Sequence, residues 1–233
     1  MVKRQRFSFI QCEAGYGHTL LLNQLGEVYA FGEGLQGQVG TGQKYMQLKT
    51  PTKLQFTDNM GEGQNIARIQ ASGNNSAAFN AENQFWVWGG TTRGKLGLLT
   101  TMRDQCEPQH VQFEVIKRFP GLPNEETVLE PFIDEPEKNK KPGSEYISEG
   151  LSFSWGLDHG LFVDSKHRLF STGFNRYGRL GHGDERDQSK FTLVKTLLNK
   201  KVIGAKCGYY HSLCVTKDGY LYSWGYGGGG RLG

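Results

Sequence analysis

The chain has 233 residues, of which 36% are hydrophobic and 21% charged, and its formal net charge is +4. These values exclude a chain that is disordered throughout or collagen-like, although glycine, with 33 residues, is about twice as frequent as usual. No apolar run approaches the ~20 residues of a membrane helix and none follows the basic N-terminus, so we expect an intracellular protein, cytoplasmic or nuclear, without a transmembrane segment or secretion signal.

The charge is unevenly distributed along the chain. Residues 120–150 contain eight acidic residues and three lysines, a net charge of −5, which leaves +9 on the rest because +4 minus −5 is +9. A basic excess spread over so many residues is a weak footprint for nucleic acid. We therefore expect protein partners, and neither nucleic acid nor a membrane.

A glycine frame recurs four times: one Gly, a second Gly five positions later, and a third three positions beyond that. The first glycines of successive frames are 57, 84 and 52 residues apart. Such a period indicates a repeat protein, with a unit of a little over fifty residues and an insertion of roughly thirty in the second unit. The frames are Gly32/Gly37/Gly40, Gly89/Gly94/Gly97, Gly173/Gly178/Gly181 and Gly225/Gly230/Gly233.

We expect the frame glycines to be structural residues of the repeat. They should mark places where the backbone turns with a positive φ or approaches a neighbouring unit closely, because glycine alone tolerates both.

The first unit sets the pattern of the others. An apolar run leads into Gly-x-x-His, and a second run, a polar turn and a third run lead into the frame. His18 stands fourteen residues before the first frame glycine, and His159 and His211 do so in the third and fourth units. We interpret the three histidines as structural residues whose ring nitrogens join strands by hydrogen bonds.

The second and third units depart from this pattern. In the second, Gly73-Asn74-Asn75-Ser76 replaces the Gly-x-x-His step, and Ser76 stands thirteen residues before Gly89. This spacing predicts a hairpin turn that is one residue shorter. Asn83 in the second unit and His167 in the third occupy the place of the turn glycine.

Alternating residues predict strands throughout. Residues 27–31 and 220–224 alternate between the two sides of a strand and follow turn residues, which is typical of β-hairpins. Fourth strands are expected at 51–56, 108–113 and 191–194, with one short helical turn within 192–199. Four antiparallel strands per unit, repeated, predict an all-β fold, a β-propeller of four-stranded blades.

Several motifs recur at fixed places in the units. Gly-x-x-His precedes a strand that ends in Trp-Gly, and Gly-Arg-Leu-Gly is followed by Gly-Asp; the clearest examples are Trp88-Gly89, Trp224-Gly225, Gly178-Arg179-Leu180-Gly181-His182-Gly183-Asp184 and Lys217-Asp218-Gly219. The repeat thus resembles that of the regulator of chromosome condensation family. The resemblance implies a seven-bladed propeller, which at this unit length needs roughly 360 residues. We expect about four of the seven blades here, as a fragment or part of a longer protein.

We expect residues 1–233 to form one partial propeller domain. The repeats are expected at approximately 8–56, 66–115, 146–194 and 201–233, and the insertion at 118–149.

No motif predicts enzymatic chemistry. Residues 32–37 and 225–230 match the GxGxxG fingerprint, but no helical pattern follows to hold a phosphate group. Histidines that recur once per blade do not converge on one metal ion, and the chain has no catalytic serine elbow or zinc-protease motif. Cys12 and Cys207 are expected to be small buried side chains. We expect no enzyme activity, no catalytic residue, no cofactor and no metal site.

Three cations occupy one repeat position. Lys95, Arg179 and Arg231 follow the second frame glycine, where Gln38 stands in the first unit. They are candidates for a set of cations on one propeller face. The alternative interpretation is that these long side chains make hydrogen bonds between blades.

The insertion is the strongest candidate for a partner-binding segment. Its apolar centre lies within a proline-rich and charged stretch, and a loop of this length in a compact domain is usually functional or disordered. The candidate residues are Leu129, Phe132, Ile133, Asp134 and Glu135.

Two functions follow from this pattern. The first is a non-enzymatic protein-interaction scaffold that binds partners, a large assembly among them, through blade-face loops and the acidic insertion. The alternative, implied by the family resemblance, is a guanine-nucleotide exchange factor for a Ran-like small GTPase. We find no stretch here that matches the wedge with which the family promotes exchange.

Overall fold

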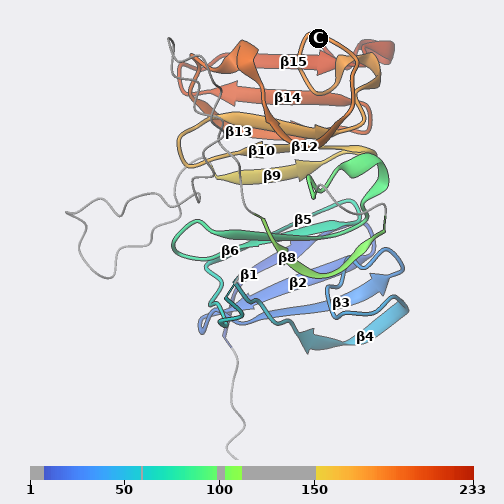
Figure 1. Ribbon diagram of the computed structural model, residues 1–233, viewed down its shortest axis with the longest axis vertical. Helices are drawn as coiled ribbons and strands as arrows, with labels where there is room; N and C mark the ends of the chain where they lie inside the picture. Colours follow the sequence, from blue (N-terminus) through green and yellow to red (C-terminus); the bar gives the residue numbers. More distant parts are fainter. Residues whose placement is uncertain (1–7, 59, 99–102, 112–150) are drawn as a thin grey trace, which may run out of the picture.

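The computed structural model describes residues 8–58, 60–98, 103–111 and 151–233. In this part of the chain every regular element is a β-strand or a three-residue 3-10 helix, and the strands form four antiparallel sheets stacked one on the next (Figure 1). No helix among these residues is long and apolar enough to cross a membrane.

Each sheet, or blade, is built from consecutive strands. Blade 1 contains β1 (Phe9–Ala14), β2 (His18–Asn23), β3 (Val28–Gly34) and β4 (Tyr45–Lys53). Blade 2 contains β5 (Arg68–Ser72), β6 (Asn75–Phe79), β7 (Phe85–Gly89) and β8 (Gln105–His110). Blade 3 contains β9 (Ser152–Trp155), β10 (His159–Val163), β11 (Leu169–Gly173) and β12 (Gln188–Leu193). Blade 4 contains β13 (Val202–Cys207), β14 (His211–Thr216) and β15 (Leu221–Gly225). The 3-10 helices are η1 (Thr92–Gly94), η2 (Arg176–Gly178), η3 (Lys195–Leu197) and η4 (Gly228–Gly230).

The predicted all-β fold of antiparallel blades is confirmed, and η3 confirms the short helical turn expected within 192–199. The predicted fourth strands are present, but each begins three to six residues earlier than predicted. Pairing with the third strand starts at the frame itself, where Gly34 pairs with Tyr45, Gly89 with Gln105 and Gly173 with Gln188. These first residues of β4, β8 and β12 do not belong to an apolar run, so hydrophobic patterning placed the strands several residues too late.

The strands give each blade two ends. The first strands of neighbouring blades contact one another, so β1, β5, β9 and β13 form the inner side of the stack. Loops between the first and second strands, and between the third and fourth, lie at one end, which we call the frame-loop face. The hairpin turns between second and third strands lie at the other end, the hairpin face. Since β8 ends and β9 begins at the hairpin face, the chain enters and leaves residues 112–150 there.

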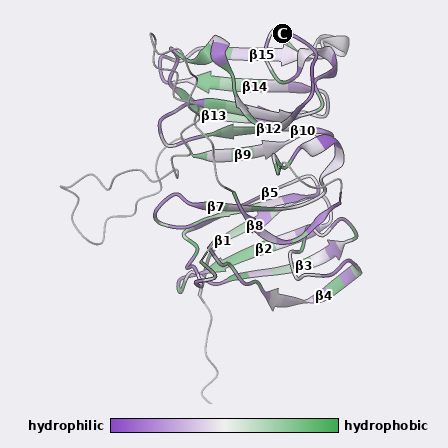
Figure 2. Ribbon diagram, viewed as in Figure 1, coloured by the Kyte–Doolittle hydropathy of each residue, from purple (hydrophilic) through white to green (hydrophobic). Residues whose placement is uncertain are grey.

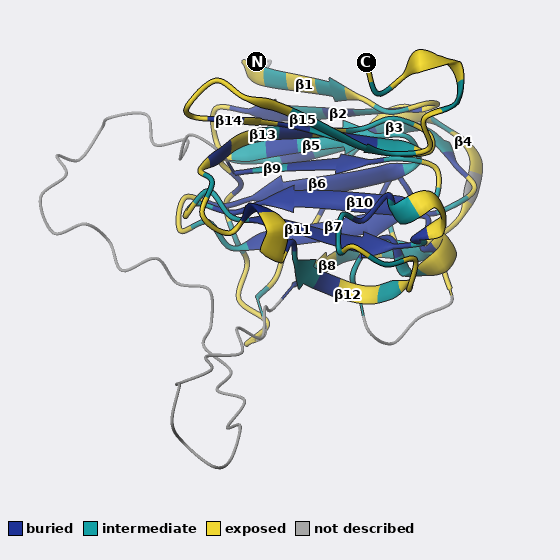
Figure 3. Ribbon diagram, turned by 90° about the horizontal axis from the view of Figure 1, so that it is seen from above, coloured by how far each residue is buried: buried dark blue, intermediate teal, exposed yellow. Residues whose placement is uncertain are grey.

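Three hydrophobic cores lie between adjacent blades. Blades 2 and 3 are covered on both faces, so β6, β7, β10 and β11 are buried at every residue (Figure 3). Hydrophobic residues concentrate in the strands and hydrophilic residues in the connecting loops (Figure 2). The middle core contains stacked aromatic rings, among them Phe153 and Phe162 with ring centroids 4.5 Å apart. Burial of these rings supplies most of the attraction between blades 2 and 3.

One arrangement of polar side chains is repeated at two of the three interfaces between blades. Between blades 1 and 2, His18 Nε2 lies 2.7 Å from Ser76 Oγ, which donates to the Gln38 carbonyl at 3.0 Å. The indole of Trp88 donates to the same carbonyl at 2.9 Å. Between blades 3 and 4, the corresponding residues are His159, Ser212, Arg179 and Trp224. We call this arrangement the interblade latch.

The latch determines the protonation state of its histidine. Ser212 has one hydroxyl hydrogen, which it donates to the Arg179 carbonyl at 2.7 Å, so its oxygen accepts from His159 Nε2–H at 3.0 Å. His159 Nδ1 is then unprotonated, and it is buried without a hydrogen-bond partner among the described residues. Protonation would place a charge and an unpaired N–H in the core. Accordingly, burial lowers the pKa of His159 to about 3 and that of His18 to about 4.

Glycine in Gly-x-x-His makes room for the imidazole. A Cβ atom on Gly15 would lie 2.2 Å from Cε1 of His18, and one on Gly208 would lie 2.0 Å from Cε1 of His211. The first frame glycine has a different role. Gly32 has φ +108°, and a Cβ there would lie 2.3 Å from the Gly17 carbonyl oxygen. Both glycines are therefore required by close packing around the latch histidine.

The third frame glycine of blades 1, 2 and 3 lies against an aromatic ring of the next blade. A Cβ on Gly40 would lie 2.6 Å from Nε1 of Trp88, and one on Gly97 would lie 2.4 Å from Cδ2 of Phe191. At Gly181 the nearest atom, in the indole of blade 4, would lie 3.1 Å away. The second frame glycine of blade 1, Gly37, approaches blade 2 as closely, because its Cβ would lie 2.7 Å from the Gln105 carbonyl oxygen. These glycines approach a neighbouring blade, as expected.

In blade 4, the second and third frame glycines meet the expectation through their positive φ and not through a close approach. The turn itself is repeated there, since the Gly233 amide donates to the Gly230 carbonyl at 3.2 Å as the Gly40 amide donates to the Gly37 carbonyl at 2.9 Å. A Cβ on Gly233 or Gly230, however, would meet no described atom within 4 Å. The physical reason is that no described residue of another blade faces this frame, so only the positive φ of +95° favours glycine at Gly233.

The interface between blades 2 and 3 lacks the latch. Asn75 pairs with Gly89 as His18 pairs with Gly32, so Asn75 holds the histidine position and the predicted shortening of the hairpin is wrong. The second unit differs in the position of its loop glycine. Gly73 stands two residues before Asn75, whereas Gly15 stands three residues before His18. Asn83 nevertheless lies at the turn position with φ 63°, as predicted.

Trp155 replaces the latch at this interface. Its indole donates to the Lys95 carbonyl at 3.1 Å, the acceptor equivalent to Gln38 and Arg179. The position of the latch serine is Gly160, where a Cβ would lie 2.9 Å from Cδ1 of Trp155. The missing histidine and the missing serine are thus compensated together by one large side chain from the first strand of blade 3.

The cysteine interpretation is wrong for Cys12, which is exposed. It lies on β1 of blade 1, where no preceding blade covers it within the described residues. Cys207, on β13, is partly buried against blade 3, and its thiol lies 3.2 Å from the Ser154 carbonyl. Burial raises the pKa of Cys207 to about 12. Cys207 is thus enclosed because blade 3 covers β13, whereas Cys12 has no such cover among the described residues.

We predict that Ser212→Ala lowers the free energy of unfolding by about 1–3 kcal/mol, because the buried His159 and Arg179 groups lose a partner. Chemical denaturation measures this change. Ser189→Ala, at an exposed serine of β12, is the matched control and should be close to neutral. Equal stability of the two variants would show that the latch contributes nothing.

We predict that stability falls as the pH drops below 6.5, the ordinary pKa of histidine. The folded-state pKa values of His18 and His159 are lower, so the unfolded chain binds protons that the folded chain does not. The contribution is constant above pH 6.5 and is lost progressively toward pH 4 and 3, by up to about 1.4 kcal/mol per pH unit for each histidine. His159→Asn, which copies Asn75, should flatten the slope measured by denaturation between pH 6.5 and 5, a window in which carboxylates titrate little.

Candidate functional site

The frame loops expose residues that the repeat holds in unusual conformations. Arg93 and Tyr177 stand directly before the second frame glycine, with φ 58° and 66°, where blade 4 has Gly229 with φ 73°. A left-handed conformation is uncommon for residues other than glycine. It places Arg93 and Tyr177 at the tips of the loops, where both are exposed.

Five tyrosines form a continuous series of rings on the frame-loop face. Tyr177 of blade 3 lies 4.7 Å from Tyr226 of blade 4, measured between ring centroids. Tyr226 continues to Tyr210 at 6.4 Å and Tyr210 to Tyr209 at 6.0 Å. Tyr209 then reaches Tyr16 of blade 1 at 6.3 Å. Each of these tyrosines is at least 36% exposed, so this is an accessible aromatic surface that spans the stack.

Arginines lie against the same rings. The guanidinium carbon of Arg176 lies 4.9 Å from the Tyr177 centroid, and that of Arg231 lies 4.8 Å from the Tyr226 centroid. Arg93 lies 4.2 Å from the centroid of Phe174, which stands three residues before Tyr177 in the same loop. We call the whole the arginine–tyrosine surface: Tyr16, Tyr177, Tyr209, Tyr210, Tyr226, Arg93, Arg176 and Arg231.

Arg179 lies beneath this surface and is 1% exposed. Its guanidinium carbon is 5.2 Å from the Tyr210 centroid and 5.7 Å from that of Tyr177, and its Nε donates to the Arg176 carbonyl at 2.9 Å. Burial lowers its pKa, while the charge of Asp158 acts in the opposite direction. Its Nη1 is buried without a hydrogen-bond partner among the described residues.

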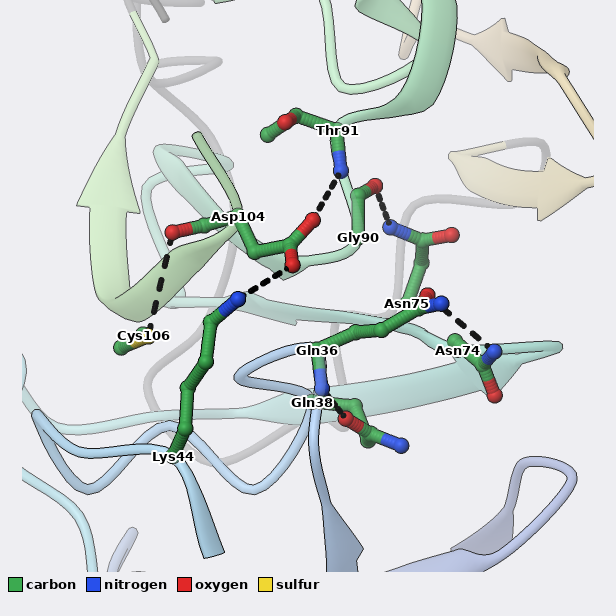
Figure 4. Close-up of polar contacts among 9 residues, drawn as sticks. All are labelled: Gln36, Gln38, Lys44, Asn74, Asn75, Gly90, Thr91, Asp104 and Cys106. Carbon is green, nitrogen blue, oxygen red and sulfur yellow. Dashed lines mark hydrogen bonds and ion pairs between the residues drawn. The ribbon is translucent and has the colours of Figure 1, made fainter. Parts of the chain in front are cut away.

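Apart from Arg93, the equivalent loops of blades 1 and 2 contain polar side chains that contact one another (Figure 4). Asn74 Nδ2 donates to Gln36 Oε1 at 3.1 Å, and Lys44 Nζ lies 2.6 Å from Asp104 Oδ2. Asp104 also accepts from the Thr91 amide at 3.2 Å. These residues pair their polar and charged groups with one another across the interface between blades 1 and 2. This part of the frame-loop face therefore offers few polar groups to a partner.

The three predicted face cations lie at different depths. Lys95 and Arg179 are 5% and 1% exposed, whereas Arg231 is exposed. Lys95 Nζ donates to the Leu157 carbonyl of blade 3 at 3.0 Å, which agrees with the alternative of a hydrogen bond between blades. A role of the three in binding a partner stays a prediction.

The other predicted residues separate into two groups. His18 and His159 lie in interblade latches, and His211 occupies the equivalent position in blade 4. In the described ranges, no group of three or more His, Cys, Asp or Glu residues could hold a metal ion. The insertion candidates Leu129, Phe132, Ile133, Asp134 and Glu135 lie outside the described residues.

The tyrosines of the surface are functional candidates that sequence reasoning missed. Tyr16, Leu157 and Tyr209 stand at one repeat position, the residue after the glycine of Gly-x-x-His. Tyr177 and Tyr226 lie at different positions of their own frames. Alignment of the repeats therefore places Tyr16 and Tyr209 at one position. Only the packing of blades 3 and 4 shows that Tyr177, Tyr210 and Tyr226 meet.

The stacked antiparallel blades, joined through their first strands, define this chain as part of a β-propeller. The Regulator of chromosome condensation (RCC1) repeat matches residues 26–79 and 166–215, and a second form of the same repeat matches residues 202–231. The chain belongs to the RCC1 repeat family.

Relatives and solved structures agree with this assignment. The chain is 29% identical to the protein RCC2 homolog of Xenopus laevis over 223 residues, which cover 93% of this chain and 40% of that protein. The structure of human WBSCR16 is similar with a TM-score of 0.70 and 22% identity, over 100% of this chain and 51% of the other. That of Prp20p from Saccharomyces cerevisiae has a TM-score of 0.68 and 21% identity, over 99% and 48%. The chain thus spans about two-fifths of the RCC2 homolog and about half of the two solved chains, and the two structures show a shared fold.

Proposed function

We propose that this chain is a non-enzymatic protein-interaction scaffold that works inside the cell, in the cytoplasm or nucleus. The observation that carries the proposal is the exposed arginine–tyrosine surface on the frame-loop face. The conspicuous polar groups of the repeat, such as His18 and Ser76, are used in contacts between the blades, which leaves the loops for recognition. Tyrosine and arginine are the residue types enriched at protein interfaces.

We propose a second contact for partners in the insertion, through Leu129, Phe132, Ile133, Asp134 and Glu135. The support is compositional: an apolar centre within an acidic stretch suits a partner with an apolar groove and a basic rim. The chain enters and leaves this segment at the hairpin face, opposite the arginine–tyrosine surface. Two faces would then engage different parts of an assembly.

We predict that deletion of residues 120–143 abolishes capture of at least one partner while the blades still fold. The free energy of unfolding should change by no more than about 1 kcal/mol, because loop length enters stability weakly. Affinity capture with quantitative mass spectrometry measures the first effect and denaturation the second. Substitution of Lys138, Lys140 and Lys141 by glutamine is the control within the same segment. An unchanged set of partners after the deletion would overturn this part of the proposal.

The alternative function is guanine-nucleotide exchange on a Ran-like small GTPase. It is supported by the fold shared with Prp20p, whose crystal structure was described together with its binding properties to Gsp1p and histones. That likeness is at 21% identity and concerns the fold. An exchange factor must also displace the nucleotide, and no described residue is a candidate for that step.

A nucleotide-release assay distinguishes the two functions. For the scaffold, we expect no acceleration of labelled GDP release from a panel of small GTPases loaded with the nucleotide, because nothing in the described chain is arranged to open a phosphate-binding loop. EDTA, which removes the magnesium ion, serves as the positive control for release. Strong acceleration by this chain would favour the exchange factor instead.

A further inference from the structure

The arginines of the surface have unused hydrogen-bond donors. Within the described ranges, the guanidinium groups of Arg93 and Arg176 make no hydrogen bond, and Arg231 makes one, to the Gly228 carbonyl. None of the three forms an ion pair with a described carboxylate, unlike Lys44 with Asp104 or Arg186 with Asp184. A guanidinium that lies over a ring keeps the N–H groups at its edge available for an acceptor.

The tyrosines add further donors. The hydroxyl groups of Tyr177, Tyr210 and Tyr226 have no hydrogen-bond partner in the part of the chain that the structure describes, whereas Tyr16 and Tyr209 interact with each other, which raises the pKa of Tyr16. The surface therefore presents donors beside rings, with the buried cation of Arg179 below. Its ligand must supply acceptors and negative charge.

Acidic groups border the surface and restrict the form of that ligand. Asp158 lies on the inner side in the β9–β10 loop, and Glu185 and Asp187 lie in the β11–β12 loop. They would repel a continuous phosphate backbone, which carries charge at every nucleotide. The faces of Tyr177, Tyr226 and Phe174 are also partly covered by arginines, although base stacking needs open ring faces. A peptide can place separate carboxylates on the arginines and contact the rings with its backbone and apolar side chains.

We propose that the arginine–tyrosine surface binds an acidic segment of a partner protein, with carboxylates on Arg93, Arg176 and Arg231. This inference rests on the proposed scaffold function and specifies the chemistry of one partner. Planar pairing of guanidinium with carboxylate supplies the orientation, and the tyrosine rings supply apolar contact. Because the pairs are at the surface, binding should weaken with salt.

The test is fluorescence anisotropy with a short labelled peptide of Asp, Glu, Leu and Gly residues. We expect the full chain to bind it more tightly than the matched peptide of Asn, Gln, Leu and Gly, and more tightly at low than at high salt. The double variant R176E/R231E should weaken binding by about tenfold or more, since it replaces attraction with repulsion. Both arginines are exposed, so the variant is expected to keep the wild-type melting temperature.

The matched control is K166E/K217E, which makes the same change of net charge at exposed lysines in hairpin turns on the opposite face. At 0.1 M salt it should leave the affinity within about twofold, since strands of five or six residues, at about 3.3 Å each, separate the two faces by more than the Debye length of about 10 Å. Equal weakening by the two double variants would mean that only net charge matters and would overturn the proposal. Tighter binding of single-stranded oligothymidine than of the acidic peptide would overturn it in favour of nucleic acid.

A further measurement separates this inference from the scaffold function. If R176E/R231E captures the same partners as wild type in affinity capture, and the acidic peptide does not bind, the acidic-segment proposal fails while the scaffold function stands. If neither the wild-type chain nor the insertion deletion captures any specific partner, the scaffold function fails. Loss of a partner by R176E/R231E, together with peptide binding, supports both.

Discussion

The packing of the blades depends on one backbone carbonyl, that of the residue after the second frame glycine. Gln38, Lys95 and Arg179 present this carbonyl to the next blade, where Trp88, Trp155 and Trp224 donate to it. In two interfaces a serine hydroxyl donates as well and positions the latch histidine. A buried carbonyl must be paired, so the loop that carries it and the strand that faces it are constrained together. The turns of the glycine frame direct this carbonyl toward the next blade.

Because the latch uses a backbone atom, the side chain at the same position is available for other contacts. Gln38 folds back to accept from the Gln36 amide, Lys95 crosses to the Leu157 carbonyl, and Arg179 lies under the tyrosines of blades 3 and 4. Arg179 therefore belongs both to the interblade latch and to the base of the arginine–tyrosine surface. The residues that hold blades 3 and 4 together also determine where Tyr177, Tyr210 and Tyr226 stand, which links blade packing to the shape of the proposed binding surface.

Fold class and strand count could be predicted well because each depends on local patterns that recur. Asn83 and His167 were identified as turn residues by spacing, and their positive φ values bear this out. Three features could not be found this way. The first residues of β4, β8 and β12 do not belong to apolar runs, and their pairing is set by the neighbouring strand. The register of Asn75 depends on its pairing with Gly89, and the exchange of Ser for Gly160 depends on Trp155 in a different strand. The arginine–tyrosine surface combines residues from all four blades that stand at several repeat positions.

By itself, the sequence determined that the chain is a repeat of antiparallel hairpins with a glycine frame, because steric limits on φ and the two-residue period of a strand act within a few neighbouring residues. It also singled out the latch histidines by their constant offset. Only the tertiary structure decided that Cys12 is exposed while Cys207 is enclosed, that Lys95 and Arg179 are buried while Arg231 is not, and that tyrosines of blades 1, 3 and 4 share one surface. The physical reason is that burial and contact between blades depend on which residues a neighbouring blade covers, a relation between segments that lie far apart in the chain.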